Sequence, residues 1–301
     1  PDEFAEIDRL AGERAGVPEA ERDRPNAAHE RLERAMAGVE RAHATALGRP
    51  VRTGDVLDWG QAFPDRVLAD AASREEALRV IAAMEAEGVW TELAELAKEP
   101  RVFAPFPRRR LLTSTVDDSM PVLRQWSRVH SGAARLAMEA GRTGEAVAYV
   151  ERNLLLSRVI ASRPGLMMAL VSQAVGVMAL NDAVAIAMSE KATPDDRAAL
   201  AGAMENAAEL DVAYALAVER QWTLRTIGEL LGSTPLVPIN RGAQQAKIDE
   251  IHERYAAAMA EPEGPARLAR AREAEAWVSG LGMRYRVAQM HAEGLGRIVE
   301  T

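Results

Sequence analysis

One stretch of the sequence, from Pro164 to Asn181, contains eighteen consecutive residues without a charged side chain. Arg163 precedes it and Asp182 follows it, so as a helix the uncharged part is only about 27 Å long. The hydrocarbon core of a bilayer is about 30 Å thick, and spanning helices are usually flanked by Trp or Tyr, which neither end carries. We therefore predict a buried central helix, from about 164 to 188, with a membrane span as the alternative.

The composition favours an all-α fold. Alanine, the residue with the highest helix propensity, is abundant, and no stretch shows the alternating Val, Ile and Thr pattern of a strand. Helical stretches of about twenty residues are separated by short connections, which is typical of antiparallel neighbours. The sequence thus predicts antiparallel helical hairpins that form a bundle or a short α-solenoid around the central helix.

Local signals mark where several of these helices begin and end. Ser73, followed three residues later by Glu76, is a capping box and predicts a helix start at Ser73. Gly141 is placed to end the helix before it, because glycine adopts the left-handed conformation without strain. Thr193 before Pro194 predicts another start, with threonine as the N-cap and proline at the first helical position.

A proline-rich stretch divides the chain. Residues 101–120 contain Pro105 and Pro107, which cannot lie inside a continuous helix. This stretch predicts a linker between an N-terminal helical part, residues 1–100, and a C-terminal helical hairpin domain, residues 121–301, although both could belong to one continuous domain. The linker also carries three consecutive arginines that could bind an anion or an acidic partner, namely Arg108, Arg109 and Arg110.

Charge and cysteine content exclude some classes of function. The net charge of −8 and the pI near 5.4 disfavour nucleic-acid binding, because phosphate backbones attract basic proteins. The chain has no cysteine, which excludes disulfides, thiolate metal ligands and a cysteine nucleophile. This absence favours an exported protein, with the cytoplasm as the alternative, although residues 1–15 lack the pattern of a signal peptide.

One segment has a pattern found in helical repeats. Residues 133–154 read AARLAMEAGRTGEAVAYVERNL, with small residues late in the first helix, Gly141 at the turn and Tyr149 in the second helix. Over residues 122–160 the chain resembles the helical hairpin of a tetratricopeptide repeat, a unit of about 34 residues. The resemblance implies helix-hairpin packing and, as in many such proteins, the binding of partner proteins. No peptide-binding residue of that family has a counterpart here, so the resemblance assigns no site.

Two acid-x-x-His pairs, Glu40 with His43 and Asp249 with His252, have the spacing that di-iron helical bundles use. With 45 acidic residues and five histidines in the chain, about 0.75 such pairs are expected by chance. Both pairs also lie among charged residues, whereas ligands in a bundle core need apolar surroundings. We predict no metal site and no cofactor.

Polar residues isolated in apolar helices are the best indication of a ligand pocket in this sequence. A pocket between the central helices would be lined by Trp126, His130, Gln173, Asn181, Asp182 and Trp222. The competing interpretation is that His130 is a hydrogen-bonded buried side chain, and that Gln173 and Asn181 form hydrogen bonds between helices.

These observations predict a non-enzymatic helical scaffold or protein-binding module whose partner is another protein, with the oligomeric state left open. The alternative is an all-α enzyme or small-ligand-binding protein that uses the pocket between the central helices. The sequence contains no phosphate-binding loop, zinc-binding helix or nucleophile elbow, so no catalytic residue is assigned.

Overall fold

The computed structural model describes residues 3–48, 67–105, 119–205, 214–215, 217–222, 241–261 and 264–281. Every regular element within these ranges is helical, which confirms the predicted all-α class. The α-helices are α1 (Glu3–Ala15), α2 (Ala27–Leu47), α4 (Ala71–Ala86), α5 (Val89–Lys98), α6 (Ser119–Glu139), α7 (Thr143–Ala161), α8 (Leu166–Ala187), α9 (Pro194–Glu205), α11 (Arg241–Met259) and α12 (Pro265–Ser279). A turn of 3-10 helix, Glu19–Glu21, follows α1.

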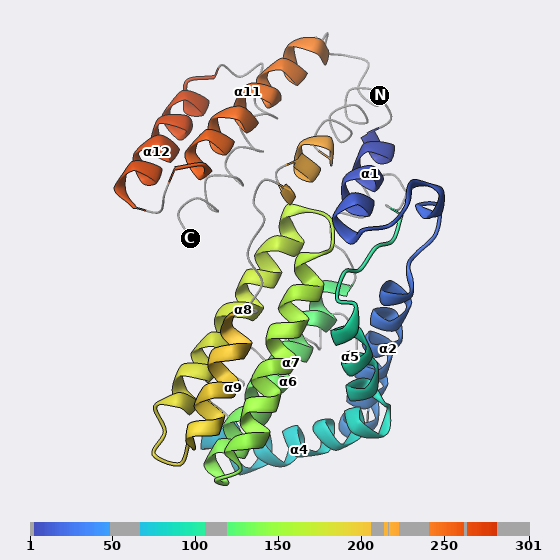
Figure 1. The fold of residues 1–301 in the computed structure, drawn as a ribbon, viewed down its shortest axis with the longest axis vertical. Helices are drawn as coiled ribbons and strands as arrows, with labels where there is room; N and C mark the ends of the chain where they lie inside the picture. The colour runs from blue at the N-terminus through green and yellow to red at the C-terminus, as the bar shows by residue number, and fades with distance from the viewer. Residues whose placement is uncertain are drawn as a thin grey trace.

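Helix α6 lies at the centre of the fold. It contacts α2, α4, α7 and α8, and Figure 1 shows it beside α7, to which it is joined by a short turn. From Gln125 to Ala134 every residue of α6 is buried. Small side chains such as Ser127 and Ser131 let neighbouring helices approach α6 from several sides. Residues 164–188 were predicted to form the buried central helix; in the structure α8 buries one face against α6 and α7, and α6 is the most completely buried of the three.

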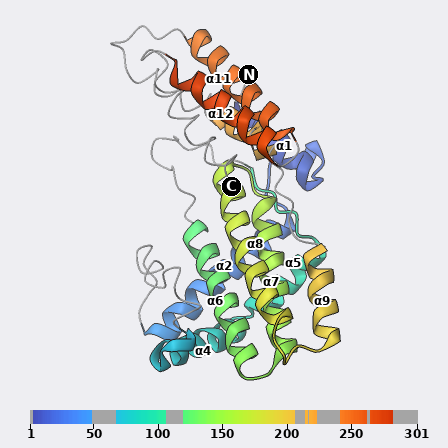
Figure 2. The same ribbon diagram turned by 90° about the vertical axis from the view of Figure 1, so that its left-hand side faces the viewer.

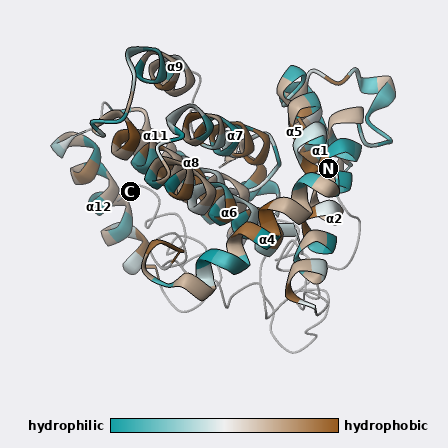
Figure 3. Ribbon diagram, turned by 90° about the horizontal axis from the view of Figure 1, so that it is seen from below, coloured by the Kyte–Doolittle hydropathy of each residue, from teal (hydrophilic) through white to brown (hydrophobic). Residues whose placement is uncertain are grey.

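The uncharged run forms α8, which begins after Gly165, a residue with a φ of 107°. One side of α8 packs against α6 and α7, whereas on the other side Val177 and Val184 are 50% and 56% exposed. Within the described ranges, α8 is the one helix long and apolar enough to cross a membrane, and 44% of that window, Met167–Ala187, is buried. In Figure 3 apolar segments lie along the adjoining α6, α7 and α8. Helix α8 therefore has one buried and one exposed face.

The helices of the N-terminal part pack against this centre. Helices α2 and α4 contact α6, and α5 contacts α7. A single apolar core includes the fully buried Leu32 of α2, Val80 of α4, Leu123 of α6 and Leu156 of α7. The predicted division of the chain at residues 101–120 stays a prediction; this core contains side chains from both sides of it.

The start of the proline-rich stretch is held against α2 by one side chain, Asn26. The Asn26 Oδ1 atom caps α2 by accepting from the His29 N–H at 2.9 Å, and it also accepts from the Phe103 N–H at 3.1 Å. The Asn26 amide nitrogen donates to the Arg101 carbonyl at 2.9 Å. Phe103 itself is 1% exposed, so residues 101–103 belong to the packed structure.

Two of the three predicted helix ends are confirmed. Gly141 follows α6 with a φ of 76°. Thr193 and Asp196 form a reciprocal cap at the start of α9: the Asp196 N–H donates to Thr193 Oγ1 at 3.1 Å, and the Thr193 N–H donates to Asp196 Oδ2 at 2.9 Å. The predicted start at Ser73 was wrong. Asp70 is the N-cap of α4, and its carboxylate accepts from the backbone N–H and the hydroxyl of Ser73.

Helices α1, α11 and α12 lie beyond one end of the α6–α8 group (Figures 1 and 2). Helices α11 and α12 pack against each other. The guanidinium of Arg14 lies 4.6 Å from the ring centre of Tyr214, and Arg220 Nε donates to Asp249 Oδ1 at 2.7 Å, so Tyr214 contacts α1 and Arg220 contacts α11.

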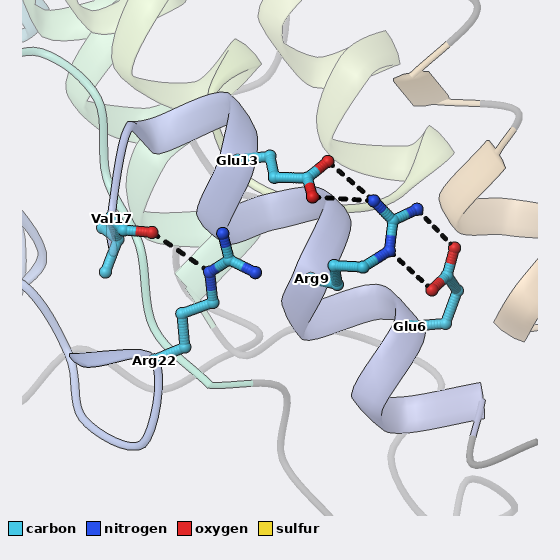
Figure 4. A network of polar contacts seen from close by, with 5 residues as sticks. All are labelled: Glu6, Arg9, Glu13, Val17 and Arg22. Atoms are coloured by element: carbon cyan, nitrogen blue, oxygen red, sulfur yellow. Dashed lines mark hydrogen bonds and ion pairs between the residues drawn. The ribbon is translucent and has the colours of Figure 1, made fainter. Parts of the chain in front are cut away.

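The surface of α1 carries a network of polar contacts (Figure 4). Arg9 binds Glu6 on one side and Glu13 on the other at 2.6–2.7 Å, and Arg22 Nε donates to the Val17 carbonyl at 3.0 Å. Exposed ion pairs of this kind contribute little to stability, so this network orders the surface of the helix and is not what holds the fold together.

Candidate functional site

Four ring side chains meet where α5, α6 and α7 adjoin; we refer to them as the aromatic cluster. They are Trp90 of α5, Trp126 and His130 of α6, and Tyr149 of α7. The centre of the His130 ring lies 5.2 Å from that of Trp90, 6.0 Å from that of Trp126 and 6.3 Å from that of Tyr149. Aromatic residues make up only 4% of the chain, so their concentration at one point is unusual for this protein.

The rings of the aromatic cluster are brought together by helical spacing, and one cation, Arg152, lies against two of them. Trp126 and His130 are four residues apart, which places them on the same face of α6. On α7, Arg152 is one turn after Tyr149, and its guanidinium lies 4.8 Å from the ring centre of Trp90 and 5.1 Å from that of Tyr149. The cation therefore covers two of the rings from the solvent side, because Trp90, Tyr149 and Arg152 are only half buried while His130 and Trp126 are fully buried.

His130 is neutral in the folded chain. Burial, and to a smaller extent the charge of Arg152, lower its pKa to about 3, while the neighbouring Asn153 side chain acts against the shift. A histidine with so low a pKa is a poor general base near neutral pH. In the described structure, Nδ1 and Nε2 of His130, Nε1 of Trp126 and Oδ1 of Asn153 are buried without a hydrogen-bond partner.

Asp182 joins α8 to α6. The Ser131 hydroxyl donates to Asp182 Oδ2, and Arg135 Nε donates to Asp182 Oδ1 at 3.0 Å. Asp182 is 3% exposed. Ser131 and Arg135 are both on α6, so the one acidic side chain of α8 lies within the helix interface and not on the open side of α8.

Close packing joins α8 to α7. The Ser157 hydroxyl donates to the Ser172 carbonyl at 2.9 Å, and the Ser172 hydroxyl donates to the Ser157 carbonyl at 2.8 Å. A Cβ atom on Gly176 would lie 3.2 Å from Ser157 Oγ, so glycine there allows the two helices to approach closely. The small and polar residues within the uncharged run thus allow α8 to pack closely against α7.

The structure brings together only part of the predicted pocket. Trp126 and His130 share the aromatic cluster, whereas the contacts of Asp182 are with Ser131 and Arg135. On α8, Gln173 is half buried and Asn181 is exposed. Trp222 is half buried in the helical stretch 217–222, outside α6 and α8, the two helices that carry the other five residues. The predicted anion-binding residues Arg108, Arg109 and Arg110 lie outside the described ranges.

Sequence reasoning missed Trp90, Tyr149, Arg152 and Asn153 as neighbours of His130. Tyr149 was noted only for its place in a helical hairpin. The scarcity of aromatic residues was a usable signal, because it makes each tryptophan and tyrosine a candidate for a shared core. Only the packing of α5 on α7 shows that Trp90 reaches this point.

The two acid-x-x-His pairs occupy different parts of the fold, on α2 and α11 (Figure 1). His43 is buried and its pKa is lowered to about 4 by that burial, while Glu40 is exposed. Asp249 is bound to Arg220. Across the described ranges, no three His, Asp or Glu side chains are grouped so that they could hold a metal ion.

The open side of α8 exposes a row of apolar side chains; we call it the outward face of α8. It is formed by Met167, Leu170, Ala174, Val177, Asn181, Val184 and Met188, all of them exposed or half buried. Among the described residues, half of the exposed large hydrophobic side chains belong to it. Apolar surface concentrated in this way marks sites of contact with other molecules.

Comparison with protein-family models, with curated proteins and with solved structures found no significant match to this chain.

Proposed function

We propose that this protein is a helical protein-interaction module and that the outward face of α8 is its binding surface. The observation that carries the proposal is the exposure of four large apolar side chains in one line on a single helix. Their exposed fractions are 56% for Met167, 50% for Val177, 56% for Val184 and 81% for Met188. A helix that presents apolar residues in this way binds by packing against a groove or another helix.

The order of helix contacts supports a module of the repeat type, either a bundle or a short α-solenoid. Consecutive helices contact each other from α6 to α9, and helices two apart also contact: α4 with α6, α5 with α7, α6 with α8, and α7 with α9. In a solenoid each helical unit packs mainly on its neighbours, and its terminal units need a polar outer face for solubility. Helix α8 is followed by α9 and is not a terminal unit, but the apolar side chains that it exposes favour a further protein surface on this helix.

The proposal predicts that position 184 contacts another protein in the native cell. We would replace Val184 by a photo-reactive phenylalanine derivative, illuminate intact cells and identify the protein adducts. Leu78 on α4, which is 48% exposed, is the matched control position. The expected result is a defined adduct at position 184, several-fold stronger than any adduct at position 78, and lost when Val177→Asp is added.

Adducts of equal strength at both positions would contradict the proposal, as would an adduct at position 184 that survives Val177→Asp. The unfolding transition of each variant is measured alongside, so that loss of an adduct is not mistaken for loss of the fold.

A small-ligand-binding protein is the second candidate function. The observation that favours it is the group of unpartnered buried atoms on Trp126, His130 and Asn153, because such atoms are normally satisfied by ordered water or a ligand. Native mass spectrometry of the freshly purified chain should then show a bound small molecule that is lost in Asn153→Leu. A mass equal to that of the chain alone would show that no small molecule is bound, so only water could form hydrogen bonds with these atoms.

A further inference from the structure

The outward face of α8 has the period of a coiled coil. Its residues fall on two interleaved series in which each position recurs after seven residues. The first series, the a positions, is Met167, Ala174, Asn181 and Met188, and the second, the d positions, is Leu170, Val177 and Val184. A repeat of about 3.5 residues keeps one seam facing a partner helix along its whole length.

In the described part of the chain, the residues of this seam are exposed or half buried. The residues on the opposite side of the same heptads, Ser172, Ala179 and Ile186, are all at most 3% exposed. They pack toward the core, so the a and d positions point away from it. Helix α8 therefore uses one face for its own fold and has a second face patterned for another helix.

The charge distribution around the outward face of α8 is compatible with a second copy of this chain as its partner. Each copy has a net charge of −8, so two copies repel unless the surfaces that meet are neutral. The positions beside the seam are uncharged: Val171, Met178 and Ala185 on one side, and Gln173, Leu180 and Ala187 on the other. The acidic residue of the helix, Asp182, is buried against Ser131 and Arg135.

Asn181 favours a second copy as the partner and a parallel orientation of the two α8 helices. Its side chain both donates and accepts hydrogen bonds, so two copies of Asn181 that meet across an axis can satisfy each other. A single asparagine at an a position is known to fix the register of paired helices in this way. If the second helix ran antiparallel, Asn181 would face Leu170 or Val177, and its amide would be buried without a partner.

We propose that the outward face of α8 binds the outward face of a second copy, with the two α8 helices parallel and the two Asn181 side chains opposite each other. This rests on the proposed function, whose partner it identifies. Parallel pairing also repeats the arrangement inside the chain, where helices two apart, such as α6 and α8, contact each other.

The absence of cysteine permits a direct test, because any introduced thiol is the only one in the chain. Single variants Met167→Cys, Val177→Cys and Met188→Cys are oxidised at equal concentration, with Leu78→Cys as the surface control. Two thiols link only if their Cα atoms come within about 7 Å. In a parallel pair each residue lies opposite its own copy, so all three α8 variants should give disulfide-linked dimers, and the control should not.

Linkage at position 177 alone would indicate antiparallel helices and overturn the proposal. Linkage no stronger than in Leu78→Cys at all three positions would also overturn it. The proposed function fails separately: if position 184 still forms an adduct with a different protein in cells, the module binds another partner and only the pairing with a second copy is wrong. Intact unfolding transitions for the four variants show that the fold is preserved.

Discussion

Lowering the pH from about 7 to about 5 should reduce the free energy of unfolding by about 4 kcal/mol. The cause is the burial of two neutral histidines, His43 on α2 and His130 on α6. Burial lowers the pKa of His43 to about 4 and that of His130 to about 3. In the unfolded chain both side chains regain their ordinary pKa of about 6.5.

The direction of the effect follows from proton binding. Between pH 6.5 and the folded pKa values, the unfolded chain takes up protons on both histidines and the folded chain does not. The free energy of unfolding therefore falls as the pH falls, by about 1.4 kcal/mol per pH unit for each histidine. Carboxylates with lowered pKa values, such as Asp196 and Glu250, lose their stabilising effect only at lower pH, so they do not account for a loss above about pH 5.

Urea unfolding at a series of pH values measures this loss. The single variants His43→Leu and His130→Leu should each remove about half of the pH dependence between pH 7 and 5, and the double variant should remove nearly all of it. A wild-type chain whose stability is constant over this interval would show that the two rings are not buried and neutral as described.

Trp126→Ala should cost about 3–5 kcal/mol, the largest loss expected from any single substitution in the aromatic cluster. Trp126 is fully buried and is part of the same apolar core as Leu123 and Leu156. Removing the indole leaves a cavity between α6 and its neighbours that these helices cannot fill without moving. Thermal or urea unfolding of the variant measures the loss.

The matched control is Trp277→Ala on α12. Trp277 is half buried, and its ring lies 4.2 Å from the guanidinium of Arg254 and 5.0 Å from the Lys247 ammonium. Cation–π contacts at such sites contribute about 0.5–1 kcal/mol, so this substitution should be much milder. Equal losses for the two variants would contradict the central position of α6. Trp126→Phe should cost less than Trp126→Ala, because it keeps most of the ring and removes a buried N–H without a partner.

Local signals in the sequence were sufficient for the fold class and for several helix ends. Gly141 and Thr193 act through their own backbone and nearest neighbours, so their roles are visible without tertiary contacts. Ser73 shows the limit of this reasoning. Its capping box is a valid pattern, but Asp70, three residues earlier, takes the N-cap role and binds the Ser73 hydroxyl as well.

The position of each helix in the fold could not be predicted from its own residues. The apolar content of α8 suggested the centre, and nothing in the sequence of α6, with its serines and arginines, indicated that it is the more deeply buried of the two. In the structure α6 is enclosed because α2, α4, α7 and α8 all contact it, while α8 contacts α6, α7 and α9 and leaves Val177 and Val184 about half exposed. The aromatic cluster was hidden for the same reason, since Trp90 and Tyr149 meet through the packing of α5 on α7.

The mass of the native chain in solution tests the role of the outward face of α8 most directly. Sedimentation equilibrium of the full chain at concentrations on the order of 10–100 µM, where mass action favours association, should give about 65 kDa, twice the 32.6 kDa of one chain. The double variant Val177→Asp, Val184→Asp should give the mass of a single chain, and Leu78→Asp should behave as the wild type. A wild-type chain that sediments as a monomer throughout this range, or a dimer that both aspartates leave intact, would contradict the account.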